Sequence, residues 1–84
     1  MKKKKHPSRN GWVLEFENGH VWSIVDLANL FGKKTPKEYI KLAKKMFPLS
    51  YIEALRVDKM SDQEMIRGKS FAEVIKLVKK YEND

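Results

Sequence analysis

Apolar and polar residues alternate over residues 12–22 on both sides of Asn18-Gly19, which is the pattern of a β-hairpin. Asn-Gly is a strong hairpin signal, because a type I′ turn requires positive φ at both of its central residues. In the register that such a turn sets, Trp12 and Trp22 lie on opposite faces, so only one of them can join a given core. The predicted cross-strand pairs are Phe16 with Val21 and Glu15 with Trp22.

After residue 22 the pattern changes to hydroxyl residues that are each followed three positions later by a carboxylate. This arrangement is typical of helix N-termini, because the hydroxyl caps a backbone N–H and the carboxylate supports the cap. Gly32 and Gly68 are expected to end helices, and Pro48 cannot continue one. The predicted caps are Ser23, Thr35, Ser50, Ser61 and Ser70, and the predicted helices cover residues 24–31, 36–47, 51–59, 62–67 and 71–82. The expected fold class is α+β, mostly α, with a helix-turn-helix-like arrangement of about five short helices after the N-terminal hairpin.

The predicted helix 36–47 has two chemically distinct sides. At about 100° per residue, its apolar residues share one arc of roughly 160°. The opposite arc carries Lys37, Lys41, Lys44 and Lys45 together with Glu38. A charged outer face is ordinary for a surface helix, but Lys33 and Lys34 precede the positive end of this helix, where anions bind well.

The net charge of +7 is concentrated in two segments of the 84-residue chain. Residues 1–9 hold Lys2, Lys3, Lys4, Lys5 and Arg9 and no acidic residue. The second basic segment is residues 32–47, with six lysines against one glutamate, whereas residues 48–84 are balanced. Because residues 1–9 lack apolar periodicity, they are expected to form a disordered basic tail before a single helix-turn-helix-like domain over 10–84. The charge pattern favours a polyanionic partner.

An internal similarity links two of the predicted helices. TPKEYIKLAKKM at 35–46 and SFAEVIKLVKKY at 70–81 align without gaps and are identical at six of twelve positions. One interpretation is a duplication of residues 24–46 as 62–81. The other is convergence, because capped amphipathic helices rich in lysine and leucine look alike. Both interpretations stay open.

Residues 23–42 resemble a helix-turn-helix. Ala28 supplies the small residue required where two helices cross, Gly32 supplies the turn, and Thr35 supplies the cap of the second helix. The turn is one residue longer than usual and contains two lysines. The second helix would present its first polar residues to the major groove of DNA.

Residues 12–45 also resemble the small DNA-binding repeats appended to intron-encoded and phage homing endonucleases. A strand pair leads into an aromatic-Ser-Ile start, an acidic residue, an alanine and a Leu-Phe-Gly segment. These residues are Trp22, Ser23, Ile24, Asp26, Ala28, Leu30, Phe31 and Gly32. The resemblance implies DNA binding in a phage or mobile-element context.

The residues needed for catalysis or metal binding are scarce. The chain has no cysteine and two histidines, and it lacks a phosphate-binding glycine loop and a nucleophile–base pair. Glu15, Glu17 and His20 fall near one another on the hairpin, but two carboxylates and an imidazole are the usual composition of a solvated face. No enzyme activity, metal or cofactor is expected. No apolar segment reaches the roughly 20 residues of a membrane span, so no membrane partner is expected and the predicted location is cytoplasmic.

These observations predict a small DNA-binding protein, a regulator of transcription or an accessory factor, that contacts duplex DNA mainly through its phosphates. Weak sequence specificity is expected, because residues 36–47 lack the arginine, asparagine and glutamine that read base edges. The alternative is a protein-binding module, such as a small phage-type inhibitor of a host protein, and RNA binding comes third. The predicted nucleic-acid-binding residues are Lys33, Lys34, Lys37, Lys41, Lys44, Lys45, Lys2, Lys3, Lys4 and Lys5.

Overall fold

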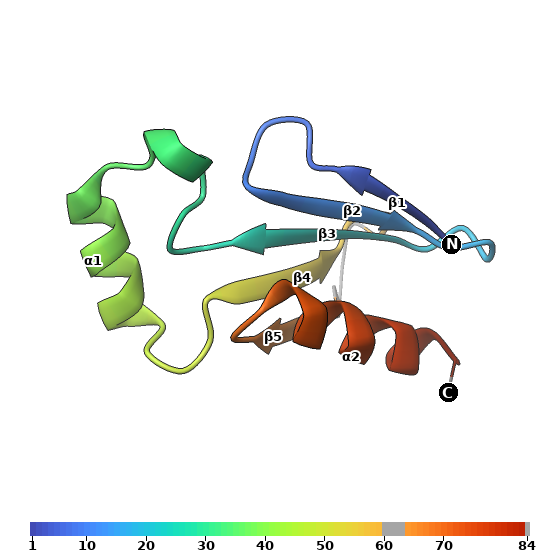
Figure 1. Ribbon diagram of the computed structural model, residues 1–84. Coiled ribbons are helices and arrows are strands. Elements are labelled where there is room, and N and C mark those ends of the chain that lie inside the picture. The colour runs from blue at the N-terminus through green and yellow to red at the C-terminus, as the bar shows by residue number, and fades with distance from the viewer. Residues whose placement is uncertain (60–63, 84) are drawn as a thin grey trace.

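The protein is built on a five-stranded antiparallel sheet whose strands lie side by side in sequence order (Figure 1). The computed structural model describes residues 1–59 and 64–83. Its strands are β1 (Lys2–Lys5), β2 (Gly11–Glu15), β3 (Val21–Asp26), β4 (Ile52–Arg56) and β5 (Met65–Gly68). Its helices are the 3-10 turn η1 (Gly32–Lys34), α1 (Lys37–Met46) and α2 (Phe71–Asn83).

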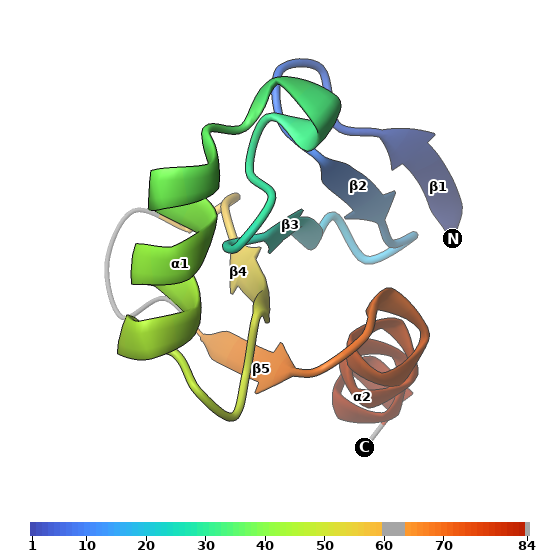
Figure 2. The ribbon, with the colours of Figure 1, turned by 60° about the vertical axis from the view of Figure 1, so that its left-hand side comes forward.

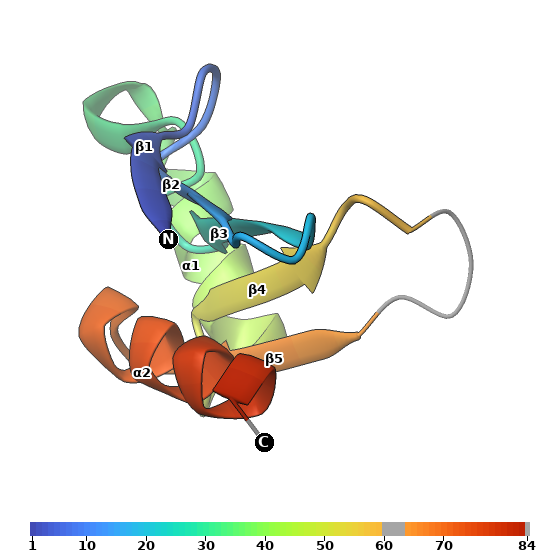
Figure 3. The same ribbon diagram turned by 90° about the vertical axis from the view of Figure 1, so that its right-hand side faces the viewer.

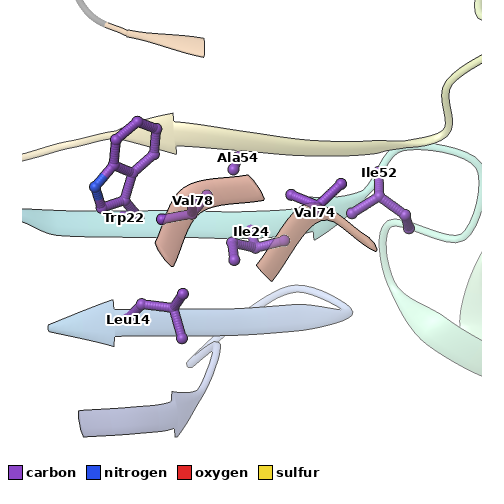
Figure 4. Close-up of a cluster of buried hydrophobic side chains, with 7 residues drawn as sticks. All are labelled: Leu14, Trp22, Ile24, Ile52, Ala54, Val74 and Val78. Carbon is purple, nitrogen blue, oxygen red and sulfur yellow. The ribbon is translucent and has the colours of Figure 1, made fainter. Parts of the chain in front are cut away.

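Helix α2 covers one face of the sheet, and the core lies between them (Figure 3). Val74 and Val78 of α2 are fully buried against side chains that alternate along the strands, as the two-residue repeat of a strand requires. These strand residues are Leu14, Trp22, Ile24, Ile52 and Ala54 (Figure 4). Helix α1 lies apart from this core, in the connection between β3 and β4 at one end of the sheet (Figure 2).

The predicted hairpin is present, but its register differs by one residue from the prediction. Glu15 pairs with Val21 and Leu14 with Trp22. The turn is longer than two residues: the Phe16 N–H donates to the His20 carbonyl at 2.9 Å, and Gly19 has a φ of 91°. A one-residue shift moves every side chain of a strand to the other face. Trp22 therefore lies in the core, on the same face of the hairpin as Leu14. Trp12 is also on this face and not on the other one, as the predicted register would require.

The mostly helical fold class is wrong, because three predicted helices are not helices. Residues 24–31 continue strand β3 and then turn, and residues 51–59 contain strand β4. Predicted helix 62–67 overlaps strand β5 where the structure describes it, while its cap Ser61 lies outside the described residues. In β4, Ile52 and Ala54 are buried and Glu53 between them is only half-buried, which is a strand period. Cross-strand packing outweighs the local cap signals there, because buried area contributes more than a single cap.

Two predicted helices, 36–47 and 71–82, are confirmed as α1 and α2. The predicted cap of α2 is formed: Ser70 Oγ accepts from the Glu73 N–H at 3.2 Å, and the Glu73 carboxylate accepts from the Lys69 N–H at 2.9 Å. Thr35 does not cap α1. Its hydroxyl accepts from the Phe31 N–H at 2.8 Å, and Pro36 occupies the cap position.

The helix-turn-helix is wrong for the same reason. Its first helix is absent, since Trp22, Ser23 and Ile24 belong to strand β3. Ala28 is buried, at 2% exposed, in the turn after that strand and not at a helix crossing. The second proposed unit likewise has strand β5 ahead of its helix. This fold offers no support for the expectations of major-groove docking, transcription regulation and a phage context that depended on the motif.

Residues 2–5 are strand β1 and not part of a disordered tail. They pair with β2 from Lys2 opposite Glu15 to Lys5 opposite Trp12. All four side chains are exposed. Lysines on an outer strand repel a second chain that would otherwise add to the free edge, so this run of charge has a structural use in addition to any binding role.

Removing β1 tests that structural use. Deleting residues 1–5 exposes the backbone groups of β2 and should lower stability by roughly 1–2 kcal/mol, since each net hydrogen bond contributes about 1 kcal/mol. The shortened protein should also self-associate more, because β2 becomes an unprotected edge. Thermal denaturation and size-exclusion chromatography measure the two effects, and an unchanged melting temperature would show that β1 adds nothing to the fold.

Among the described residues, no helix is long and apolar enough to cross a membrane.

Candidate nucleic-acid interface

The ten predicted binding lysines are all exposed, but they do not form one cluster. Six of them follow one another on η1 and α1, at one end of the sheet (Figure 2). Lys5 lies at that same end of β1, whereas Lys2 is at the far end of the strand, opposite Glu15. Alternate residues of a strand point to opposite faces of the sheet. Lys2 and Lys4 therefore project from one face, and Lys3 and Lys5 project from the other.

Backbone hydrogen bonds hold the β1–β2 loop beside the segment that leads into η1. The Asn10 N–H donates to the Leu30 carbonyl at 2.6 Å, and the Asp26 N–H donates to the Asn10 carbonyl at 3.0 Å. The Asp26 carboxylate then accepts from the N–H groups of Ala28 and Asn29, which turns the chain out of the sheet. Arg9 and Lys5 are thereby brought close to Gly32 at the start of η1.

His6 gives the β1–β2 loop its shape. Its Nδ1 accepts from the backbone N–H groups of Ser8 at 3.3 Å and Arg9 at 3.1 Å. Burial and the neighbouring Arg9 guanidinium hold the pKa of His6 below its ordinary value. The ring is therefore neutral at pH 7 and keeps the lone pair that these two hydrogen bonds require.

An open groove of about 360 Å³ lies between the two segments, lined by residues 5–12 and 31–32. Its lining contains Lys5 and Arg9 but no acidic residue. Two aromatic side chains reach it: Phe31, which is 54% exposed, and the half-buried Trp12. The Lys3 ammonium lies 4.3 Å from the centre of the Trp12 ring, a cation–π contact. The groove thus combines aromatic surface with positive charge.

The described acidic side chains that form ion pairs lie mostly away from this end of the molecule. Asp58, for example, pairs with Arg56 at 2.9 Å beyond the far end of β4. The exception is Glu53, which lies opposite Val25 near the start of β4 and pairs with Arg67 at 3.2 Å. Hydrogen bonds from the Arg56 side chain and from the Val21 N–H hold the pKa of Asp58 well below its usual range. By contrast, no ion pair to any residue in 1–59 or 64–83 engages the six lysines of η1 and α1. Their charge therefore faces solvent.

A second feature of this end is an apolar strip on α1. Ala43 is buried, but Leu42 and Met46 on the same apolar arc are 54% and 62% exposed, and Leu49 just beyond the helix is 72% exposed. The arc is wider than the surface that the fold covers. The sequence pattern shows which residues of a helix are apolar, but it does not show how much of their surface a neighbouring element covers.

His20 takes part in a different cluster, at the far end of the sheet. It hydrogen-bonds Glu82 of α2 at 2.8 Å, and the same carboxylate accepts from the Trp22 indole N–H at 2.8 Å and the Asn18 amide at 2.9 Å. The Glu82 side chain is only 3% exposed. The carboxylate joins α2 to the hairpin, so its evident role is structural.

Comparisons with protein-family models, curated proteins and solved structures found no match for this chain.

Sequence reasoning identifies the lysines of η1 and α1 but misses the groove. The sequence pattern predicts a helix–turn segment around Phe31 and a disordered tail around Arg9, and it leaves open which of Trp12 and Trp22 joins the core. The hydrogen bond from Asn10 to Leu30 holds the two segments that line the groove beside each other, and no local sequence pattern links positions twenty residues apart.

Proposed function

We propose that the protein binds nucleic acid, mainly through phosphate contacts made by its basic end. This basic end consists of Lys5, Arg9, and the six lysines of η1 and α1. The observation that carries the proposal is that these six lysines are exposed and make no ion pairs within the part of the chain that the structure describes. Phosphate contacts of this kind supply most of the affinity of nonspecific nucleic-acid binding.

The test replaces three lysines of α1 with alanine and compares this variant with a second variant that lacks three lysines of α2. The variant K37A/K41A/K44A should fold, because all three side chains are exposed, and should bind a single-stranded oligonucleotide more weakly. Its salt slope, the change of log K with log salt concentration, should fall by roughly 0.7 for each phosphate that the variant no longer neutralises. Fluorescence anisotropy across a salt series measures both quantities.

The matched control is K76A/K79A/K80A on α2, which removes the same charge from exposed positions outside the basic end. Its salt slope should stay near that of the parent protein. If the two variants lost the same affinity and salt slope, binding would depend only on net charge. If the oligonucleotide bound neither the parent protein nor the variants, the proposal would be wrong.

The exposed strip of α1 favours a second candidate function, the binding of another protein. Exposed apolar residues that lie together, unlike ones scattered singly over a surface, mark interaction sites. The strip contains three of them: Leu42, Met46 and Leu49. In this case M46D should abolish capture of a partner from nuclease-treated lysate while leaving oligonucleotide binding unchanged. Capture that is the same for parent and M46D would remove the strip from consideration.

A further inference from the structure

Phe31 is an exposed aromatic residue on a fixed backbone. Its N–H donates to the hydroxyl of Thr35 at 2.8 Å, and Thr35 is itself 7% exposed. The next residue, Gly32, adopts a φ of 64°, and its N–H donates to the Asn29 carbonyl at 2.9 Å. The main chain is therefore held at this point while more than half of the Phe31 surface faces solvent. This aromatic surface is already in place before any ligand arrives.

Cations surround the groove that Phe31 and Trp12 line. Lys5 and Arg9 belong to its lining, and Lys3 lies over the Trp12 ring. Gly32, also in the lining, is followed within η1 by Lys33 and Lys34. Sites that bind single-stranded nucleic acid combine aromatic faces for the bases with basic side chains for the backbone. The groove volume of about 360 Å³ is within the range of small-molecule sites.

From this arrangement we infer that the groove accepts an unpaired nucleobase, stacked on Phe31, while Lys5, Arg9 and the η1 lysines hold the flanking phosphates. The inference rests on the proposed function and narrows it to single-stranded nucleic acid. A duplex cannot use the site, because its base faces are already stacked on one another. The absence of acidic residues from the groove lining matches an anionic partner and disfavours a basic one.

The experiment compares probes with and without accessible bases. The probes are oligothymidylate, oligouridylate, a DNA duplex of the same length and inorganic polyphosphate. The protein should bind both single strands more tightly than the duplex or polyphosphate. The two single strands also show whether the base is taken from DNA or RNA. F31A should weaken single-strand binding by roughly tenfold or more, as the loss of one stacked base implies.

Three control variants distinguish stacking from other effects. F31W should restore single-strand affinity, because it keeps an aromatic face. L49A removes a side chain that is also highly exposed, and should change nothing. F31A should leave the duplex and polyphosphate affinities unchanged and should match the parent in thermal denaturation, since Phe31 is not in the core.

Tryptophan fluorescence gives a second readout. Trp22 is fully buried, so quenching on adding a single strand should arise from Trp12 and should be lost in W12F. The inference is overturned if F31A binds single strands as well as the parent does, or if the parent binds polyphosphate as tightly as oligothymidylate. In either case the proposed function survives through the lysines. If the parent binds none of the four probes, both fail.

Discussion

Gly11→Ala is expected to disrupt the sheet severely. A Cβ atom at position 11 would lie 1.9 Å from the Ile24 carbonyl oxygen and 2.9 Å from the Ile24 carbonyl carbon, both part of the neighbouring strand β3. Backbone cannot yield as a side chain can, so β2 and β3 must separate where Gly11 faces Val25. We expect a loss of about 3 kcal/mol or more, the upper part of the range for overpacking. For a domain of this size that is much of the total stability.

The matched control is another glycine in the same sheet, Gly68. A Cβ there would lie 2.8 Å from the Cγ2 methyl of the buried Val74, so this side chain must shift, whereas no backbone atom of a neighbouring strand is among its nearest atoms. Gly68→Ala should therefore lower the melting temperature, but less than Gly11→Ala. Equal effects of the two substitutions would show that the close approach of Gly11 to β3 is not a constraint in solution.

Glu82→Ala should be the second most damaging change. It removes the acceptor for Trp22, Asn18 and His20 and leaves the buried indole N–H without a partner. Losing charge-assisted hydrogen bonds of this kind costs roughly 2–3 kcal/mol. The melting temperature should fall by roughly 10–20 °C in a domain of this length. Lys80→Ala, an exposed position on the same helix, should have little effect.

The same carboxylate should make stability depend on pH. Burial raises the pKa of Glu82, but hydrogen bonds from Asn18, Trp22 and His20 together outweigh burial and hold the pKa below its ordinary value. Because the folded pKa is the lower one, the stabilisation is present above the unfolded value of 4.5 and is lost as the pH falls through the folded value. The difference in stability between parent and Glu82→Ala should therefore shrink below pH 4.5. A difference that stays constant down to the acid limit would contradict this role of the carboxylate.

The candidate site could be predicted from the sequence only in part. Four lysines stand out as charge on one arc of a helix, and their exposure follows from that pattern: Lys37, Lys41, Lys44 and Lys45. Phe31, Trp12 and Arg9 carry no such signal. They meet because β2 lies between β1 and β3, which places the loop at residues 6–10 against the chain leaving β3. Long-range pairing of this kind leaves no periodicity in either segment.

The sequence by itself determined the features that depend on neighbours a few residues apart. These are the two amphipathic helices α1 and α2, the Ser70–Glu73 cap and the turn containing Gly19. Tertiary structure decided the rest: the register of the hairpin, the ordering of Lys2–Lys5 as β1, and the strand state of residues 52–56 and 65–68. A strand has no hydrogen-bond partners within itself and takes its conformation from the chain beside it. Local cap signals near Ser23 and Ser50 therefore competed with burial of Trp22, Ile24 and Ile52 under α2, and burial prevailed because it removes far more apolar surface from water.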